Sequence, residues 1–121
     1  MYFFRREKIQ CRYQFSLRDA VDITLLQRAL TAALASAPYY TQRLVQEKRE
    51  MWLEPNTEPC LVYPGSTMRN IPEQTNGYLF CVSCAGDTVY FDWHHFLLDG
   101  HGVSPLLTSI LEQYCNLRYG T

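Results

Sequence analysis

The spacing of hydrophobic residues changes from strand-like to helix-like within the first forty residues. In residues 11–17, Tyr13, Phe15 and Leu17 alternate with polar side chains. Alternation places the two sets of side chains on opposite faces of an extended chain, so this segment is predicted to be a half-buried strand.

A helix is predicted over residues 23–37, where apolar side chains return every three or four positions. Asp22 is placed to cap its first turn, with Val21 and Leu26 as a hydrophobic staple across the cap. Pro38 marks its end. The buried face is predicted to hold Leu26, Ala29, Leu30, Ala33 and Ala37, and the opposite polar face Gln27, Arg28 and Thr31.

The middle of the chain is predicted to contain one hairpin and one long loop. Two short extended runs within residues 42–54 flank the charged pair Lys48 and Arg49, which is consistent with a hairpin. Residues 55–77 hold four prolines and two glycines, so most of this segment is predicted to be loop, with a short strand at residues 60–63.

A second hairpin and a terminal helix are predicted after the loop. Residues 78–84 and 88–93 are rich in aromatic and β-branched side chains, and the turn residues 85–87 separate them. Ser104 is the predicted N-cap of the last helix and Pro105 lies in its first turn. The buried face of that helix is predicted to hold Leu106, Leu107, Ile110, Leu111, Tyr114 and Leu117.

Two helices and four to six strands in this order predict an α+β fold, a two-layer sandwich with a mainly antiparallel sheet covered by helices. The chain has 121 residues, of which 47% are hydrophobic and 14% aromatic, so it can form one well-packed core. We therefore expect residues 1–121 to be a single domain.

Charge and cysteine content exclude several classes of protein. The formal net charge is −1 and the basic residues are scattered, so no nucleic-acid-binding stripe is present. The first residues contain two arginines and no long apolar run, so neither a signal peptide nor a membrane span is expected. We therefore expect a cytoplasmic location. The five cysteines form an odd set without regular spacing and are expected to be reduced thiols.

The main candidate site is the segment HHFLLDG, from His94 to Gly100, which follows the last predicted strand. A histidine can exchange a proton near neutral pH, and a well-placed general base is worth about 100- to 10,000-fold in rate. On a strand, His94 and His95 point to opposite faces, so only one of them can serve a given cavity. Asp99 can brace the turn, and Gly100 permits a positive φ. A pair of core-edge histidines before a helix-capping turn is the alternative reading.

HHFLLDG resembles the HHxxxDG motif of the coenzyme-A-dependent acyltransferase superfamily. That superfamily includes chloramphenicol acetyltransferase, alcohol acetyltransferases, wax ester synthases and the condensation domains of nonribosomal peptide synthesis. The flanking sequences FDW and HGVSPLLTSILEQY resemble the strand and helix on either side of the motif, and VDITLLQRALTAALASAP resembles the family's first helix. The resemblance implies one lobe of the chloramphenicol acetyltransferase-like fold.

The resemblance also implies roles for four residues. His95 corresponds to the catalytic base, which takes a proton from a hydroxyl or amine acceptor as that group attacks an acyl thioester. Asp99 corresponds to a site organiser that pairs with an arginine from elsewhere in the fold, and His94 and Gly100 to positions that keep the site's shape. No metal and no permanently bound cofactor are implied. The co-substrate is acyl-coenzyme A or a carrier-protein thioester, and the second substrate is a small-molecule acceptor.

Members of the superfamily are substantially longer than this chain. The condensation-like members are pseudo-dimers of two similar halves with the active site in a tunnel between them, and 121 residues correspond to the N-terminal half. We therefore expect a C-terminal lobe, or further copies of this chain, to complete an acyltransferase. A non-catalytic binding or interaction module that retains the half-fold is the alternative.

Two other constellations are weaker. Cys81, Cys84, His95 and His101 approach the spacing of a zinc finger, but ten residues separate Cys84 from His95 where about twelve are usual. Cysteines three positions apart on a strand also point to opposite faces, so a metal site is not favoured. His101 is interpreted as a solvated turn residue.

Four cysteines are conceivable nucleophiles beside His95, although such thiols usually pack as small apolar side chains. They are Cys60, Cys81, Cys84 and Cys115. Trp52, Tyr90 and Trp93 are candidates to line a pocket, with a place in the core as the commoner outcome.

Overall fold

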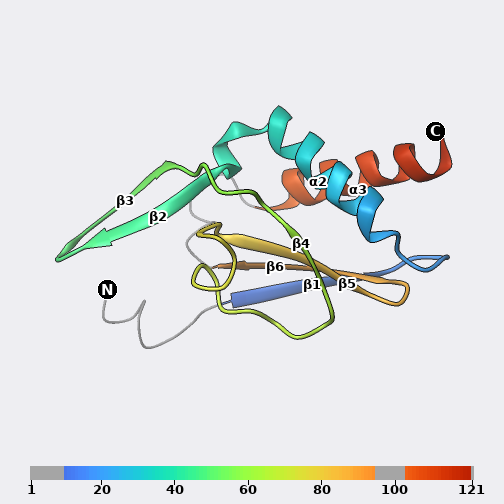
Figure 1. Ribbon diagram of the computed structural model, residues 1–121, viewed down its shortest axis with the longest axis horizontal. Helices are drawn as coiled ribbons and strands as arrows, with labels where there is room; N and C mark the ends of the chain where they lie inside the picture. The colour runs from blue at the N-terminus through green and yellow to red at the C-terminus, as the bar shows by residue number, and fades with distance from the viewer. Residues whose placement is uncertain (1–9, 95–102, 121) are drawn as a thin grey trace.

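The computed structural model describes residues 10–94 and 103–120, which form a layer of two helices on one face of a sheet (Figure 1). The elements, in chain order, are β1 (Gln10–Ser16), α2 (Ile23–Ser36), the short 3-10 helix η1 (Pro38–Tyr40), β2 (Gln42–Glu47), β3 (Glu50–Pro55), β4 (Val62–Pro64), β5 (Phe80–Ala85), β6 (Thr88–His94) and α3 (Ser104–Tyr119).

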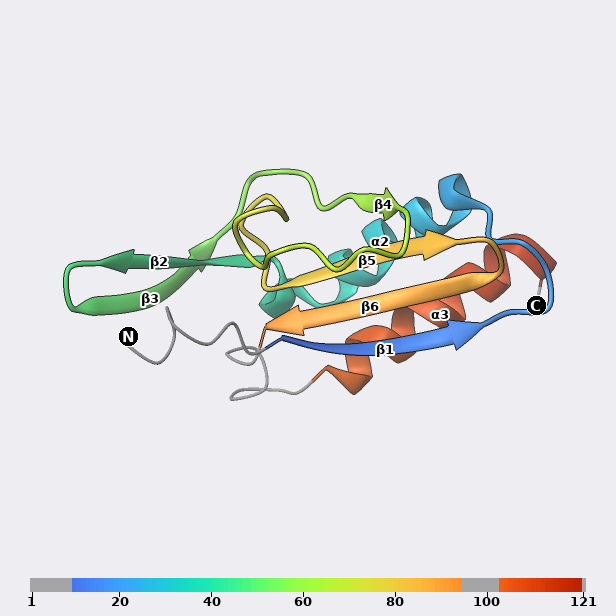
Figure 2. The same ribbon diagram turned by 90° about the horizontal axis from the view of Figure 1, so that it is seen from below.

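In the described part of the chain, the main sheet has four strands in the order β1-β6-β5-β4. β6 is antiparallel to both β1 and β5, whereas the three-residue β4 runs parallel to β5. Figure 2 shows β6 between β1 and β5, with both helices behind the sheet. The predicted α+β two-layer sandwich with a mainly antiparallel sheet is therefore confirmed.

The core lies between the sheet and the two helices. Alternate residues of β5 and β6 point into it, as the strand period requires, and the sheet side of the core includes Phe80, Val82, Val89, Phe91 and Trp93. The helix side includes Leu26, Ala29, Leu30, Ala33, Leu34, Leu106, Leu107, Ile110 and Tyr114. Phe80 and Phe91 stack with ring centroids 5.6 Å apart, which joins the two central strands within the core.

α2 begins as its sequence predicts. The Asp22 carboxylate accepts hydrogen bonds from the backbone N–H groups of Thr24 and Leu25, each at 3.1 Å. The helix ends at Ser36, one residue before the predicted end, because Ala37 leaves the helical conformation and Pro38 starts η1. Leu34 also belongs to the buried face of α2, where it was not predicted.

α3 differs from its prediction at both ends. Its N-cap is Val103, and Ser104 is already helical and makes no side-chain capping bond, so the predicted cap was wrong by one residue. Leu117 is 36% exposed rather than buried, because it lies with Gln113 along the outer seam between the two helices, away from the sheet. Leu111 is partly buried.

β1 is an edge strand of the main sheet, and this explains a second difference from the sequence analysis. Phe15 and Leu17 pack against the core as predicted, but Tyr13 is 42% exposed. Among the described residues, β6 is the only strand that pairs with β1, so a large side chain in the middle of β1 keeps part of its surface in solvent.

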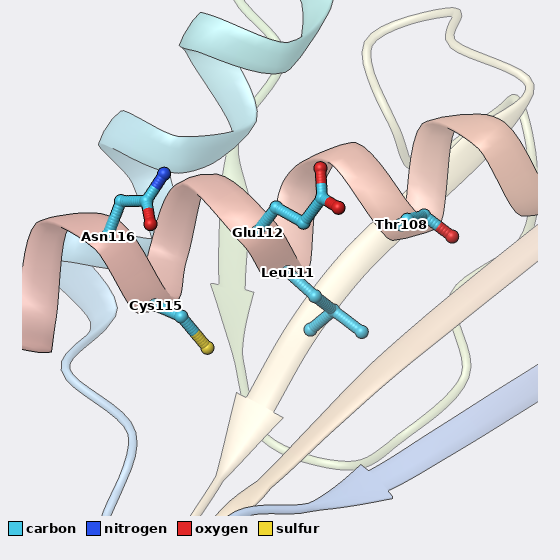
Figure 3. Close-up of a pocket in the computed structure, with 5 residues that line it drawn as sticks. All are labelled: Thr108, Leu111, Glu112, Cys115 and Asn116. Carbon is cyan, nitrogen blue, oxygen red and sulfur yellow. The ribbon is translucent and has the colours of Figure 1, made fainter. Parts of the chain in front are cut away.

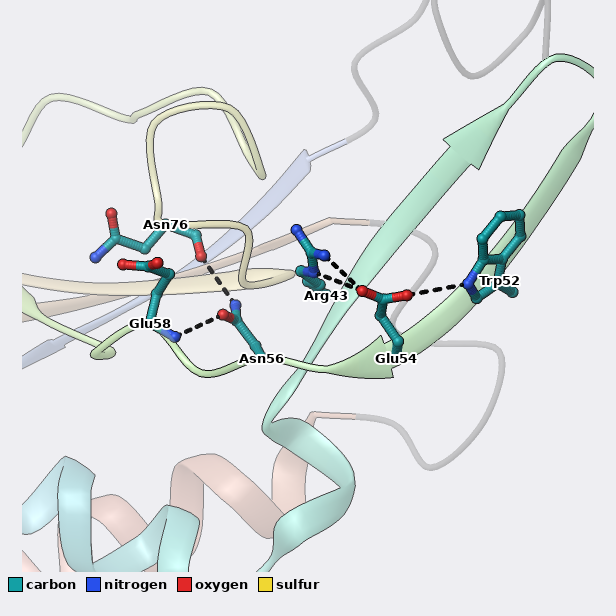
Figure 4. A network of polar contacts seen from close by, with 6 residues as sticks. All are labelled: Arg43, Trp52, Glu54, Asn56, Glu58 and Asn76. Carbon is teal, nitrogen blue, oxygen red and sulfur yellow. Dashed lines mark hydrogen bonds and ion pairs between the residues drawn. The ribbon is translucent and has the colours of Figure 1, made fainter.

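The hairpin β2–β3 forms a separate two-stranded sheet that extends beyond the layers (Figures 1 and 2). The Asn56 side chain fastens its base, because its amide donates to the Asn76 carbonyl and its oxygen accepts from the Glu58 N–H, both at 2.9 Å (Figure 4). On the hairpin itself, Arg43 pairs with Glu54 across the strands. An isolated two-stranded hairpin is marginally stable, so the Asn56 bonds at its base and the Arg43–Glu54 pair across its strands both contribute to its stability.

Candidate functional site

The candidate site begins at the end of β6, the central strand that carries the first histidine of the motif. His94 is the last residue of β6 and is 2% exposed. Its backbone N–H donates to the Leu79 carbonyl at 2.8 Å, and it lies opposite Gln10 in the register with β1. The backbone of His94 is therefore held between both neighbouring strands.

The other three motif residues, His95, Asp99 and Gly100, lie outside the residues that the structure describes. Their assigned roles stay predictions, as does the expectation that the two histidines face opposite ways. What the structure does supply is the surroundings of the strand that leads into them.

Strand alternation separates the side chains of β6 into two environments. Phe91 and Trp93 point into the core, and Tyr13 of β1 lies against Trp93 with ring centroids 4.7 Å apart. Tyr90, Asp92 and His94 alternate with them and belong to the opposite face of the sheet. The three aromatic pocket candidates are therefore not brought together, because Trp93 is in the core, Tyr90 is on the other face, and Trp52 lies in the hairpin.

The face opposite the helices contains a buried ion pair that the sequence analysis missed. Asp92 is fully buried, and Arg12 binds its carboxylate through two hydrogen bonds, Nε to Oδ1 at 2.6 Å and Nη2 to Oδ2 at 3.0 Å. The bond to Asp92 is the main cause of a raised pKa of Arg12. The guanidinium also lies 4.5 Å from the centre of the Tyr90 ring.

The loop between β4 and β5 covers the same face. Arg12 donates through Nη1 to the Ser66 carbonyl at 2.7 Å. The Gln10 side chain donates to the Arg69 carbonyl at 3.0 Å and accepts from the Ile71 N–H at 2.8 Å. Residues 66–71, which we call the cover segment, are thus attached to β1 at two points. Ile71, the last residue of the segment, is fully buried.

The candidate thiols of Cys60, Cys81 and Cys84 are poor nucleophiles. Burial raises the thiol pKa of Cys60 well above its usual value and that of Cys81 to about 12, and it also raises the pKa of Cys84. A thiol reacts as its thiolate, so these groups stay protonated and inert near neutral pH.

The structure also bears on the zinc alternative. Cys84 belongs to the core, whereas Cys81, three positions earlier on β5, belongs to the opposite face, as the spacing predicted. Within residues 10–94 and 103–120, no three side chains of histidine, cysteine, aspartate or glutamate are grouped closely enough to hold a metal ion.

A hollow of about 570 Å³ lies along the side of α3 (Figure 3). Its described lining consists of Thr108, Leu111, Glu112, Cys115 and Asn116. Cys115 is exposed there, but none of these lining residues is a histidine, which a cysteine nucleophile normally uses as its base.

Comparison with known proteins identifies the fold. No family model and no curated protein matches the chain. Among solved structures, the starter condensation domain of the rhizomide synthetase RzmA matches 93% of this chain with a TM-score of 0.66 and 14% sequence identity. The chain has the fold of a condensation-domain lobe.

A second solved structure supports the assignment of a condensation-domain lobe. It comes from work on condensation domain-mediated chain release from the enacyloxin polyketide synthase, and it matches 93% of this chain with a TM-score of 0.52 and 14% identity. The lobe spans 33% of the first structure and 26% of the second. The resemblance inferred from the sequence is therefore confirmed for the fold, and the chain covers about a third of such a domain or less.

One further finding concerns membranes. In the part of the lobe that the structure describes, neither helix has the length and hydrophobicity needed to cross a bilayer.

Proposed function

We propose that this chain is the N-terminal lobe of an acyltransferase and that it contributes the general base, His95. The observation that carries the proposal is the position of β6. In a fold shared with condensation domains, this central strand holds His94 at its buried end, and His95 is the next residue in the chain. A base must be held by a rigid element to work, and a central strand provides one.

The proposed reaction transfers an acyl group from a thioester, either acyl-coenzyme A or a carrier-protein thioester, to a hydroxyl or amine. The acceptor oxygen or nitrogen attacks the thioester carbonyl while the His95 imidazole takes its proton. The carbon–sulfur bond then breaks, and the protonated imidazole returns the proton to the departing thiolate. Atoms and charges balance without a metal or a redox cofactor.

The proposal includes a partner for the lobe. The solved condensation domains are about three to four times as long as the part that this chain matches. A second lobe, or another copy of this chain, would supply the remaining walls of the substrate tunnel.

The test is release of free thiol from acetyl-coenzyme A in the presence of alcohols and amines. We expect His95→Ala to abolish release, because no other group replaces the base. His101→Ala is the matched control, since it removes a histidine from the same segment that has no proposed role, and it should retain the rate.

The assay is run on monomeric and self-associated fractions that circular dichroism shows to be folded. His95-dependent release supports the proposal. Release that is unchanged in His95→Ala contradicts the assignment of the base. Absence of release from every folded fraction contradicts acyl transfer by this chain without a second lobe, and favours a fragment of a longer enzyme or a binding module.

A further inference from the structure

The buried ion pair of Arg12 and Asp92 lies just before the histidine pair in space and in sequence. Asp92 precedes His94 by two positions on β6, so both belong to the same face of that strand. On β1, Arg12 stands opposite Asp92 and Gln10 stands opposite His94. The ion pair and the first histidine therefore occupy neighbouring cross-strand positions on one face of the sheet.

Arg12 joins three separate parts of the chain at this point. It belongs to β1, it binds Asp92 of β6 through two hydrogen bonds, and it donates to the Ser66 carbonyl of the cover segment. Gln10, two positions earlier, holds the other end of the cover segment through Arg69 and Ile71. The cover segment is thus fixed at the two positions that face Asp92 and His94.

The burial of Asp92 makes this arrangement sensitive to Arg12. A carboxylate with no exposed surface is strongly unfavourable without a charged partner. If β6 moved relative to β1, or if the cover segment lifted, the Asp92 carboxylate would lose its bidentate geometry or gain water. The ion pair therefore restricts the position of the last residues of β6.

We propose that Arg12 is a positioning residue for the histidine pair. The proposal rests on the function proposed above for His95. Arg12 acts through Asp92, which fixes the end of β6, and through Ser66, which holds the cover segment over the same face, and it need not touch a substrate. A displacement of about 1 Å in a reacting group can cost about 100-fold in rate, so a loosened strand end has a measurable effect.

The first test measures kcat and KM for acetyl-coenzyme A in Arg12→Met, Arg12→Lys and Arg43→Met. All variants are assayed at a temperature at which circular dichroism shows each of them fully folded, so that lost stability alone does not change the rate. We expect Arg12→Met to lower kcat by about 10- to 100-fold with little change in KM, and Arg12→Lys to recover part of the loss.

Arg43→Met is the matched control. It breaks the ion pair with Glu54 in the hairpin, where the side chains are 51% and 34% exposed, and it should leave kcat unchanged. A fully folded Arg12→Met protein with the wild-type kcat would overturn the proposal. If Arg12→Met does not fold, Asp92→Asn, which keeps the side-chain shape and removes the charge, replaces it and is judged in the same way.

A second readout separates this proposal from the proposed activity. The ring proton and carbon resonances of His94 and His95 are recorded by NMR with isotope-labelled histidine. We expect both to shift in Arg12→Met, to return towards wild type in Arg12→Lys, and to stay unchanged in Arg43→Met. If the histidine resonances are unaltered in Arg12→Met, the positioning role is overturned, even where the chain shows no acyl transfer. If they shift in a chain that is inactive, the positioning role is supported and only the proposed activity is refuted.

Discussion

The Gln27 side chain should contribute substantially to stability, although it stands on the face of α2 that sequence periodicity assigns to solvent. Its amide donates to the Cys60 carbonyl at 2.8 Å, and its oxygen accepts from the Val62 N–H at 2.7 Å. These two bonds resemble those that a neighbouring strand would make with β4. Gln27→Ala therefore leaves one backbone donor and one backbone acceptor without their partner.

The expected loss follows from the burial of these two groups. An unsatisfied buried polar group costs about 1 to 3 kcal/mol. Val62 is buried and Cys60 is only partly buried, so water can replace part of the second bond, and we expect a total loss of about 2 to 4 kcal/mol. A chain of this length has a free energy of unfolding of about 6 to 18 kcal/mol, so this is a large share. At about 4 °C per kcal/mol, the melting temperature should fall by about 8 to 16 °C.

The assay is urea unfolding followed by circular dichroism, with amide hydrogen exchange at Val62 as a local probe. Arg28→Ala is the control, because Arg28 is the next residue of the same helix and is exposed. It should stay within about 0.5 kcal/mol of wild type, as surface substitutions usually do. A Gln27→Ala protein that also stays within that margin, with unchanged exchange at Val62, would refute the reasoning.

Two further predictions concern titratable groups. In the folded protein, exposed Cys115 should react with iodoacetamide at about pH 8, whereas Cys81 should not, because burial raises its pKa to about 12; equal labelling of the two in tryptic peptides would contradict this. Hydrogen bonds from Arg43 and then Trp52 lower the pKa of Glu54 below 4.5, so its contribution to the hairpin is complete above that pH and is lost as the pH falls through the lowered value. Trp52 fluorescence, corrected with Glu54→Gln, should titrate with a midpoint below pH 4.5, and a midpoint at or above 4.5 would refute the pairing.

Local patterns were sufficient to predict most elements of the fold. The aromatic and β-branched runs on either side of the turn residues 85–87 predicted the β5–β6 hairpin, and Asp22 with the periodic apolar residues predicted α2. These signals depend on neighbours within a few positions. The predicted ends of β1, α2, β4, β5 and α3 were wrong by one or two residues; β4, for example, was predicted at residues 60–63 and is observed at Val62–Pro64. These ends depend on tertiary contacts and backbone conformations that such patterns do not specify.

The contacts around the candidate site were less predictable because they join distant segments. Arg12 and Asp92 are 80 positions apart, and their pairing depends on the register between β1 and β6, which side-chain alternation alone does not define. Gln27 was placed on a polar face correctly, but nothing in its own helix indicates that Cys60 and Val62 lie beside it. The HHFLLDG motif was recognisable from its residues, and the roles of His95, Asp99 and Gly100 stay predictions.

The strand order also has a consequence for how the chain folds. β1 and β5 do not pair with each other, since each is hydrogen-bonded to β6. During synthesis, β1 can therefore pair within this sheet only after the segment that contains Asp92, 80 residues later than Arg12, has left the ribosome. Pairings at such sequence separation are slow to form because the intervening chain must first be closed into a loop. The strand that ends in the first histidine is thus also the one that must form before β1 can join the sheet.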